Sequence, residues 1–82
     1  MYLAKIIVTL KKSILDPQGK TVHHALESLG MDAVSEVRIG KFIEIKINAN
    51  NEIDAHKIAE EASKKLLANP VMEDYSFTIE KL

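Results

Sequence analysis

Few residues of this 82-residue chain have the types and spacing that chemistry requires. His23 and His24 are adjacent, and on a helix their side chains would lie about 100° apart, too far to hold one metal ion from one face. His56 stands alone in a second predicted helix. Neither a Ser-His-Asp arrangement nor a glycine-rich phosphate loop can be proposed. We therefore expect surface or rim histidines, and no catalytic, cofactor-binding or metal site.

Two activities known for small α/β sandwiches find little support. RNA-binding sheets present aromatic side chains on which bases stack, and Phe42 is the single candidate here. Small acyl-phosphate hydrolases need an arginine after the first strand, whereas Arg38, the only arginine, comes much later. With 11 basic and 12 acidic residues, the formal net charge is −1, so the basic patch of a nucleic-acid binder is missing. We expect no nucleic-acid partner.

The length predicts one domain, residues 1–82, with a small core. A chain of this size buries only about 60–65% of the surface that its unfolded form exposes. No cysteine is present to cross-link it. Small scaffolds of this kind often gain stability by self-association, so we expect a homodimer or a higher homo-oligomer. No stretch resembles a signal peptide or a membrane span, which favours a cytoplasmic protein without a membrane partner.

Alternation of apolar and polar residues predicts strands in three parts of the chain. The first covers residues 2–12 and has one apolar face, made of Ala4, Ile6, Val8 and Leu10. Residues 34–48 are interpreted as a hairpin around Gly40, with an odd-length connection or a bulge, so that Ile39 pairs with Ile43. In the last strand the inward-facing residues are Tyr75, Phe77 and Ile79.

Helical spacing predicts a helix after the first strand. Asp16 can cap it with Pro17 at its first position, although a turn followed by a helix from Lys20 fits equally well. Gly30 ends the helix in a left-handed conformation. The expected buried stripe consists of Val22, Ala25, Leu26 and Leu29.

A second helix begins at Asn50 or Asn51 and stops before Pro70. Its expected buried stripe is Ala55, Ile58, Ala59, Ala62 and Leu66. The element order is then strand, helix, strand, strand, helix, strand. This order predicts an α+β fold, a ferredoxin-like βαββαβ two-layer sandwich whose four-stranded antiparallel sheet carries both helices on one face.

Four segments together carry a family resemblance: Leu10–Lys12 with Leu15–Gly19, Ala25–Leu26 with Leu29–Gly30, Val37–Lys41 with Glu44, and Lys65–Tyr75. In this order and spacing they resemble the PurS family, the small subunits of phosphoribosylformylglycinamidine (FGAM) synthase. The resemblance runs over nearly the whole chain. Its most specific part is the ending Leu66–Val71, followed by Glu73 and Tyr75.

The resemblance implies a role in de novo purine biosynthesis. FGAM synthase converts the formylglycinamide ribonucleotide, glutamine and ATP into FGAM, glutamate, ADP and phosphate. A glutaminase subunit releases ammonia, and a large synthetase subunit uses ATP and magnesium. The small subunit would bridge these two partners and support ammonia transfer, without a cofactor or a catalytic activity of its own.

Several residues of the matching segments lack a full packing explanation and are candidates for partner contact. Arg38 and Lys41 flank the predicted hairpin tip and could reach carboxylates on a partner. Tyr75 offers an apolar body with a polar tip, which is common at interfaces. The complete candidate interface is Arg38, Gly40, Lys41, Asn69, Pro70, Glu73 and Tyr75. An alternative from another class is a regulatory domain of the same fold that binds a small metabolite at a dimer interface.

Overall fold

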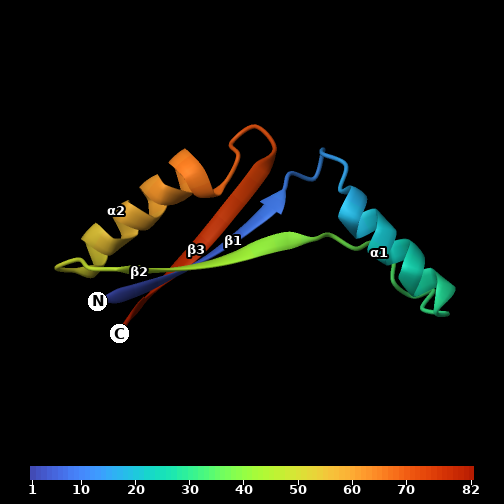
Figure 1. Ribbon diagram of the computed structural model, residues 1–82, viewed down its shortest axis with the longest axis horizontal. Helices are drawn as coiled ribbons and strands as arrows, with labels where there is room; N and C mark the ends of the chain where they lie inside the picture. The colour runs from blue at the N-terminus through green and yellow to red at the C-terminus, as the bar shows by residue number, and fades with distance from the viewer.

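The computed structural model describes residues 1–82. Its elements in chain order are β1 (Tyr2–Leu10), α1 (Pro17–Ser28), β2 (Gly40–Ile47), α2 (Glu52–Ala62), the π-helical turn η1 (Ser63–Leu67) and β3 (Glu73–Lys81). The three strands form one antiparallel sheet in the order β2-β1-β3, so β1 is central. Figure 1 shows two parts: the sheet with α2 along one face, and an arm formed by α1 and the chain that returns from it.

The core lies between β1 and α2. Ala4, Ile6 and Val8 point from β1 toward the helix and are fully buried. Ala55 and Ala59 of α2 are also fully buried, and their small side chains let the helix lie close to the sheet. The flanking strands contribute Ile43, Ile45 and Ile47 of β2, and Tyr75, Phe77 and Ile79 of β3. The predicted inward face of the last strand is therefore confirmed, as is that of the first strand from Ala4 to Val8.

The register is continuous across the sheet. Ile6 lies opposite Ile43 of β2 and opposite Phe77 of β3. On the face away from α2, Lys5 Nζ lies 2.7 Å from Glu80 Oε1, and this hydrogen bond raises the pKa of Lys5. Ile7 on the same face is 51% exposed. Phe42 of β2 lies opposite Ile7 and is 60% exposed, so this face is open in the single chain and carries an apolar pair beside its charged residues.

The predicted four-stranded sheet is wrong, because residues 34–39 form no strand. The hairpin around Gly40 is also wrong: Gly40 begins β2 and lies opposite Thr9. Residues 34–39 instead return beside α1, where Val37 passes so close to Gly19 that an added Cβ would lie 2.2 Å from its carbonyl oxygen. A glycine at this point of the helix is what permits the approach.

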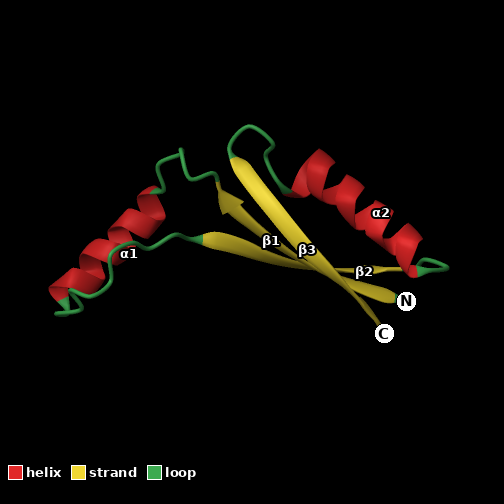
Figure 2. Ribbon diagram, turned by 180° about the vertical axis from the view of Figure 1, so that it is seen from behind, coloured by secondary structure: helices red, strands yellow, loops and turns green.

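The prediction that both helices cover one face of the sheet is also wrong. Helix α1 projects away from the sheet, and only α2 lies along it (Figures 1 and 2). The predicted buried stripe of α1 is consequently uncovered, with Val22 at 39% and Leu29 at 73% exposure. The radius of gyration is 16.2 Å, whereas a compact chain of this length would have about 12 Å.

The termini of both helices follow their sequence signals. Asp16 caps α1 and Pro17 is its first residue, which decides between the two predicted starts. Gly30 has φ +86°, as predicted for the residue that ends α1. Asn51 caps α2 by accepting the backbone N–H of Asp54 at 2.8 Å. No helix of the structure is both long enough and apolar enough to span a bilayer.

The end of the second helix departs from the prediction. The backbone N–H of Ala68 donates to the carbonyl oxygen of Ser63 at 2.9 Å, which closes a π turn instead of an α turn. Ser63 and Ala68 are buried as a result, whereas Leu66 is 82% exposed. Ile58, also predicted to be buried, is 43% exposed. The buried stripe thus runs through Ala55, Ala59 and Ser63, rotated from the predicted one.

Candidate partner interface

Four of the seven candidate residues lie in two connecting segments at the same end of the sheet, and Gly40, Lys41 and Tyr75 lie in the adjoining strands. We call residues 10–16 together with 38–39 the hinge, because they connect the sheet to the arm. We call residues 66–73, which connect η1 to β3, the corner. The hinge and the corner are joined by one backbone hydrogen bond, in which Lys11 N donates to Met72 O at 2.8 Å.

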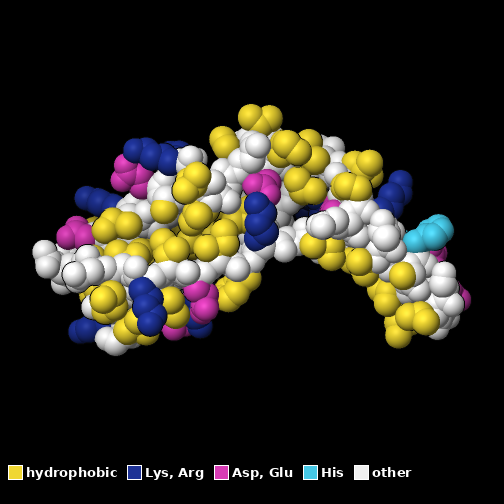
Figure 3. Space-filling view, viewed as in Figure 1, with side chains coloured by type: hydrophobic (Ala, Val, Ile, Leu, Met, Phe, Trp, Pro, Cys, Tyr) yellow, Lys and Arg dark blue, Asp and Glu magenta, His cyan; other side chains and the backbone are white.

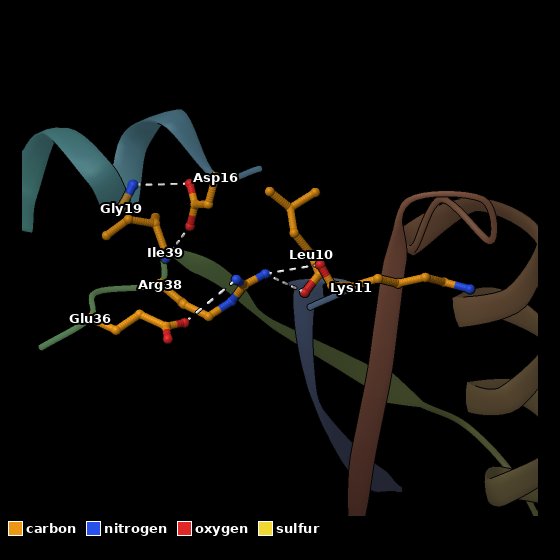
Figure 4. A network of polar contacts seen from close by, with 7 residues as sticks. All are labelled: Leu10, Lys11, Asp16, Gly19, Glu36, Arg38 and Ile39. Atoms are coloured by element: carbon orange, nitrogen blue, oxygen red, sulfur yellow. Dashed lines mark hydrogen bonds and ion pairs between the residues drawn. The ribbon is translucent and has the colours of Figure 1, made fainter. Parts of the chain in front are cut away.

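Arg38 holds the hinge together from inside the chain. Its Nη2 atom donates to the carbonyl oxygens of Leu10, at 2.9 Å, and Lys11, at 3.0 Å (Figure 4). Its Nη1 atom lies 3.7 Å from Glu36 Oε1. The guanidinium therefore satisfies the carbonyl groups of the last residue of β1 and of the residue that follows it. The sequence reasoning that aimed Arg38 at a partner missed this internal role.

Asp16 fastens both ends of the arm with one carboxylate. Oδ1 accepts the backbone N–H of Gly19 at 2.9 Å, and Oδ2 accepts that of Ile39 at 2.7 Å (Figure 4). These hydrogen bonds to Gly19 and Ile39 favour the charged form and hold the pKa of Asp16 below its usual value, and the Arg38 charge adds to the effect. Asp16 was predicted only as a helix cap. Its second bond, to Ile39, had no signal in the sequence.

The histidines take part in local packing. His23 Nε2 donates to the carbonyl oxygen of Val34 at 2.7 Å, which adds a bond between α1 and its returning segment. His24 is exposed, and the ring of His56 lies 4.9 Å from that of Phe77. No three or more His, Asp or Glu side chains are grouped so that they could hold a metal ion.

Glu73 and Asn69 fix the corner through a compact set of hydrogen bonds. Glu73 Oε1 accepts the backbone N–H of Asn69 at 2.8 Å, and Asn69 Oδ1 accepts that of Val71 at 3.0 Å. The carbonyl oxygen of Asn69 accepts the N–H groups of Met72 and Glu73, at 3.2 and 2.7 Å. Lys41 Nζ lies 3.5 Å from Glu73 Oε2 and links β2 to the corner. The side-chain oxygens of Asn69 and Glu73 are thus used within the chain.

Tyr75 and Gly40 serve the packing of the sheet. The hydroxyl of Tyr75 donates to Glu60 Oε1 on α2 at 2.6 Å, and this bond raises the pKa of Tyr75. A Cβ at Gly40 would lie 2.6 Å from the carbonyl oxygen of Val8, so glycine lets β2 approach β1. The structure therefore brings Lys41, Asn69 and Glu73 together, and places Tyr75 elsewhere, between β3 and α2.

What the corner offers to solvent is mainly apolar. A depression of about 570 Å³ there is bordered by Leu10, Lys41, Lys65, Glu73 and the residues from 66 to 72. Leu66, Val71 and Met72 are 82%, 77% and 42% exposed, and Pro70 is also exposed. Pro70 was among the predicted candidates, whereas Leu66 was missed because it was assigned to the buried stripe, and Val71 and Met72 were not among the candidates. Such a surface can bind another protein through apolar contact.

Comparisons with known proteins place this chain in a family. The PurS family, described as phosphoribosylformylglycinamidine (FGAM) synthase, matches residues 3–81. The FGAM synthase subunit PurS of Bacillus subtilis is 45% identical over 82 residues, which cover 100% of this chain and 96% of that protein. Among solved structures, Methanocaldococcus jannaschii PurS, one of the subunits of formylglycinamide ribonucleotide amidotransferase in the purine biosynthetic pathway, has a TM-score of 0.88 and 46% identity.

That structure covers 100% of this chain and is itself covered to 99%. A chain in the structure of PurLQS from Thermotoga maritima has a TM-score of 0.86 and 30% identity, with 98% of this chain and 99% of that chain covered. Because these matches include α1 as well as the sheet, the projecting arm belongs to the shared fold. The chain is therefore a member of the PurS family of FGAM synthase subunits.

Proposed function

We propose that this chain is the small bridging subunit of FGAM synthase, which holds the glutaminase and synthetase subunits together and supports ammonia transfer between them. The observation that carries the proposal is its match, over nearly its full length, to a chain of the PurLQS assembly. In this assignment ATP and magnesium bind to the synthetase subunit. The small subunit catalyses no step alone, binds no cofactor and works in the cytoplasm.

We also propose that the working form is a homodimer or a higher homo-oligomer in which the arm of one copy is covered by another. Two facts support this. Hydrophobic side chains lie along the inner edge of the arm without cover from the sheet (Figure 3), and Leu29, at the end of α1, is 73% exposed. Only 11 of 82 residues are buried in the single chain, too few for a stable domain alone.

Reconstitution from separately purified subunits tests the bridging role. FGAM formation from glutamine is expected only when all three subunits are present, whereas formation from added ammonia should persist without the small subunit. Lys41→Glu should lower the glutamine-driven rate more than the ammonia-driven rate, because it repels Glu73 and disturbs the corner. Lys57→Glu, on the exposed side of α2, is the matched control. Turnover by the small chain alone, or equal loss of both rates, would contradict the proposal.

The oligomer is tested by light scattering on the isolated chain. Leu29→Asp places a charge in the uncovered stripe and should shift the protein toward smaller species. Ser28→Asp introduces the same charge at the neighbouring exposed position, outside the stripe, and should leave the mass unchanged. A monomeric wild-type chain at micromolar concentration would contradict this part.

A further inference from the structure

We propose that two copies of this chain exchange their arms, so that residues 34–39 of each copy pair antiparallel with the free edge of β2 of the other, in a register centred on Lys41. The inference rests on the proposed homo-oligomer and deepens it by assigning the contacting strands and their pairing. In this assembly α1 of each copy covers the sheet of the other copy.

Each copy has both a free strand edge and a segment able to occupy one. β2 lies at the edge of the sheet, because the strand order is β2-β1-β3. Residues 34–39 leave the start of β2 and run away from the sheet without turning back (Figure 2). The backbone N–H groups of Glu36 and Arg38 donate no hydrogen bond within the chain. Unpaired backbone at a strand edge is a template for pairing with another chain.

The connectivity of the chain identifies a second copy as the occupant. In a hairpin around Gly40, residues 34–39 would fold back onto β2 of the same chain. No turn exists there, because Gly40 begins β2 opposite Thr9, and the carboxylate of Asp16 holds Ile39 in the arm. The segment is therefore kept away from the edge of its own β2. A two-fold axis near this point allows the same pairing between copies, which is domain swapping.

The apolar residues of the segment match those of β2 across such an axis. Val37 and Ile39 continue the alternation of Ile43 and Ile45, whose side chains pack against the core. When residues equally distant from Lys41 face each other, Ile39 lies opposite the other copy's Ile43, and Val37 lies opposite its Ile45. Each pair forms twice, because the contact is symmetric. The exchange therefore covers Ile39, which is 38% exposed in the single chain.

The charged residues match in the same register. Arg38 lies opposite the other copy's Glu44, and Glu36 lies opposite its Lys46. Glu44 and Lys46 form no ion pair within their own chain. The Nη1 atom of Arg38 donates no hydrogen bond there, since its contact with Glu36 is 3.7 Å long. Lys41 meets its own counterpart at the axis, where Glu73 of each copy, 3.5 Å from its own Lys41, offsets the repulsion.

Neighbouring registers are less favourable. Moving the axis one residue toward the N-terminus sets Glu36 against the other copy's Glu44. Moving it one residue toward the C-terminus sets Arg38 against Lys46. Like charges directly opposite each other on neighbouring strands are destabilising, whereas opposite charges stabilise. An axis between two residues would place the apolar side of one copy beside the polar side of the other. The register centred on Lys41 avoids all three conflicts.

The exchange also covers the apolar stripe of α1. The helix moves together with residues 34–39, because His23 bonds to the carbonyl oxygen of Val34. Val22 and Ile39 border an open depression of about 480 Å³ on the arm. When the segment lies along the other copy's β2, this depression and Leu29 come to face the other copy. The uncovered stripe and the free edge of β2 are then both occupied by one contact.

Disulfide trapping reports the register directly, because the chain has no cysteine of its own. Lys41→Cys places one thiol of each copy at the axis, so mild oxidation of the full-length chain should convert most of it into a covalent dimer on a non-reducing gel. Phe42→Cys, one residue away, is the matched control. Its Cα atoms would lie more than about 7 Å apart in the dimer, too far for a disulfide, so most of this variant should stay uncross-linked.

Charge reversal tests the pairing without a covalent bond. Lys46→Glu sets a carboxylate against Glu36 twice in each dimer and should raise the dissociation constant of the dimer at least threefold, as analytical ultracentrifugation at low salt can measure. Adding Glu36→Lys to the same chain restores opposite charges and should bring the constant back to within about twofold of wild type. Lys57→Glu on the exposed side of α2 changes the net charge equally and is the control.

The outcomes separate the inference from the proposals on which it rests. Cross-linking of Phe42→Cys as fast as that of Lys41→Cys overturns the inference, as does a Lys46→Glu defect that Glu36→Lys does not reverse. A dimer in which neither cysteine cross-links uses another interface, which overturns the inference and leaves the homo-oligomer standing. A monomeric wild-type chain overturns the homo-oligomer and the inference together, and the bridging role is still judged by reconstitution.

Discussion

The carboxylate of Asp16 accepts the backbone N–H of Ile39 at 2.7 Å, across 23 residues of chain. The same side chain caps α1 through Gly19. One residue thus fixes the start of the helix and the end of the segment that returns from it. The orientation of the whole arm relative to the sheet depends on this carboxylate and on Arg38 beside it.

Replacing Asp16 by alanine should loosen the arm without unfolding the sheet. Both backbone N–H groups lose their acceptor, so amides between residues 17 and 39 should exchange with solvent at least tenfold faster, as hydrogen–deuterium exchange can measure. Amides of β1 from Ala4 to Val8 should keep their protection. Asp32→Ala, at an exposed position near the far end of the arm, is the control. Equal acceleration in β1 would show that Asp16 supports the core as well.

The same interaction should depend on pH at the acid end. Its bonds to Gly19 and Ile39 place the pKa of Asp16 below the usual 3.8 in the folded chain. A lowered folded-state pKa contributes stability that is present above the unfolded-state pKa and is lost as the pH falls through the folded value. We expect a carboxyl titration by NMR below 3.8, with arm protection falling over the same range relative to β1. Asp16→Asn should lack this step.

The two faces of β1 should respond differently to truncation. Ile6 is fully buried, so Ile6→Ala should lower the free energy of unfolding by about 2–5 kcal/mol in urea titrations. Ile7 is 51% exposed on the opposite face, and Ile7→Ala should change the free energy of unfolding by about 0.5 kcal/mol. A large loss for Ile7→Ala at constant protein concentration would show instead that another copy covers the open face.

Replacing either of two glycines by alanine should destabilise the fold, for a different reason at each position. Gly40→Ala places a Cβ 2.6 Å from the carbonyl oxygen of Val8 and should lower the free energy of unfolding by about 1–3 kcal/mol, because β2 must move. Gly30→Ala meets no neighbour but strains a backbone with φ +86°, at about 1–2 kcal/mol. Asparagine tolerates that conformation, so it should partly restore stability at position 30 and not at position 40, as thermal unfolding can check.

The elements with a clear local period were predictable from the sequence. The alternation through Ile6 and Val8 identified β1 and its buried face, and Asp16, Gly30 and Asn51 marked helix ends through chemistry that acts within a few residues. These signals are local, and the structure agrees with them. The family resemblance supplied the function, which local patterns alone did not indicate.

The predictions that failed concerned contacts between residues far apart in the sequence. An apolar stripe such as that of α1 indicates that one face of the helix packs against other apolar side chains. It does not indicate whether those side chains belong to the same chain or to another. The hairpin prediction assumed that Gly40 marks a turn, whereas the glycine serves a close approach to Val8. The apolar surface at the corner was missed because a period of 3.6 residues places Leu66 on the buried face of the helix. One irregular turn is enough to move that side chain to the exposed face.

The π turn at Ser63–Leu67 makes this part of the chain unusually sensitive to length. Deleting a single residue within it would restore ordinary winding and swing the following side chain by about 100°. Leu66 would then be drawn toward the sheet, and the loop before β3 would have to span the gap with one residue fewer. A substitution at the same place leaves the spacing intact, so this turn should accept changes of residue type far more readily than changes of residue number.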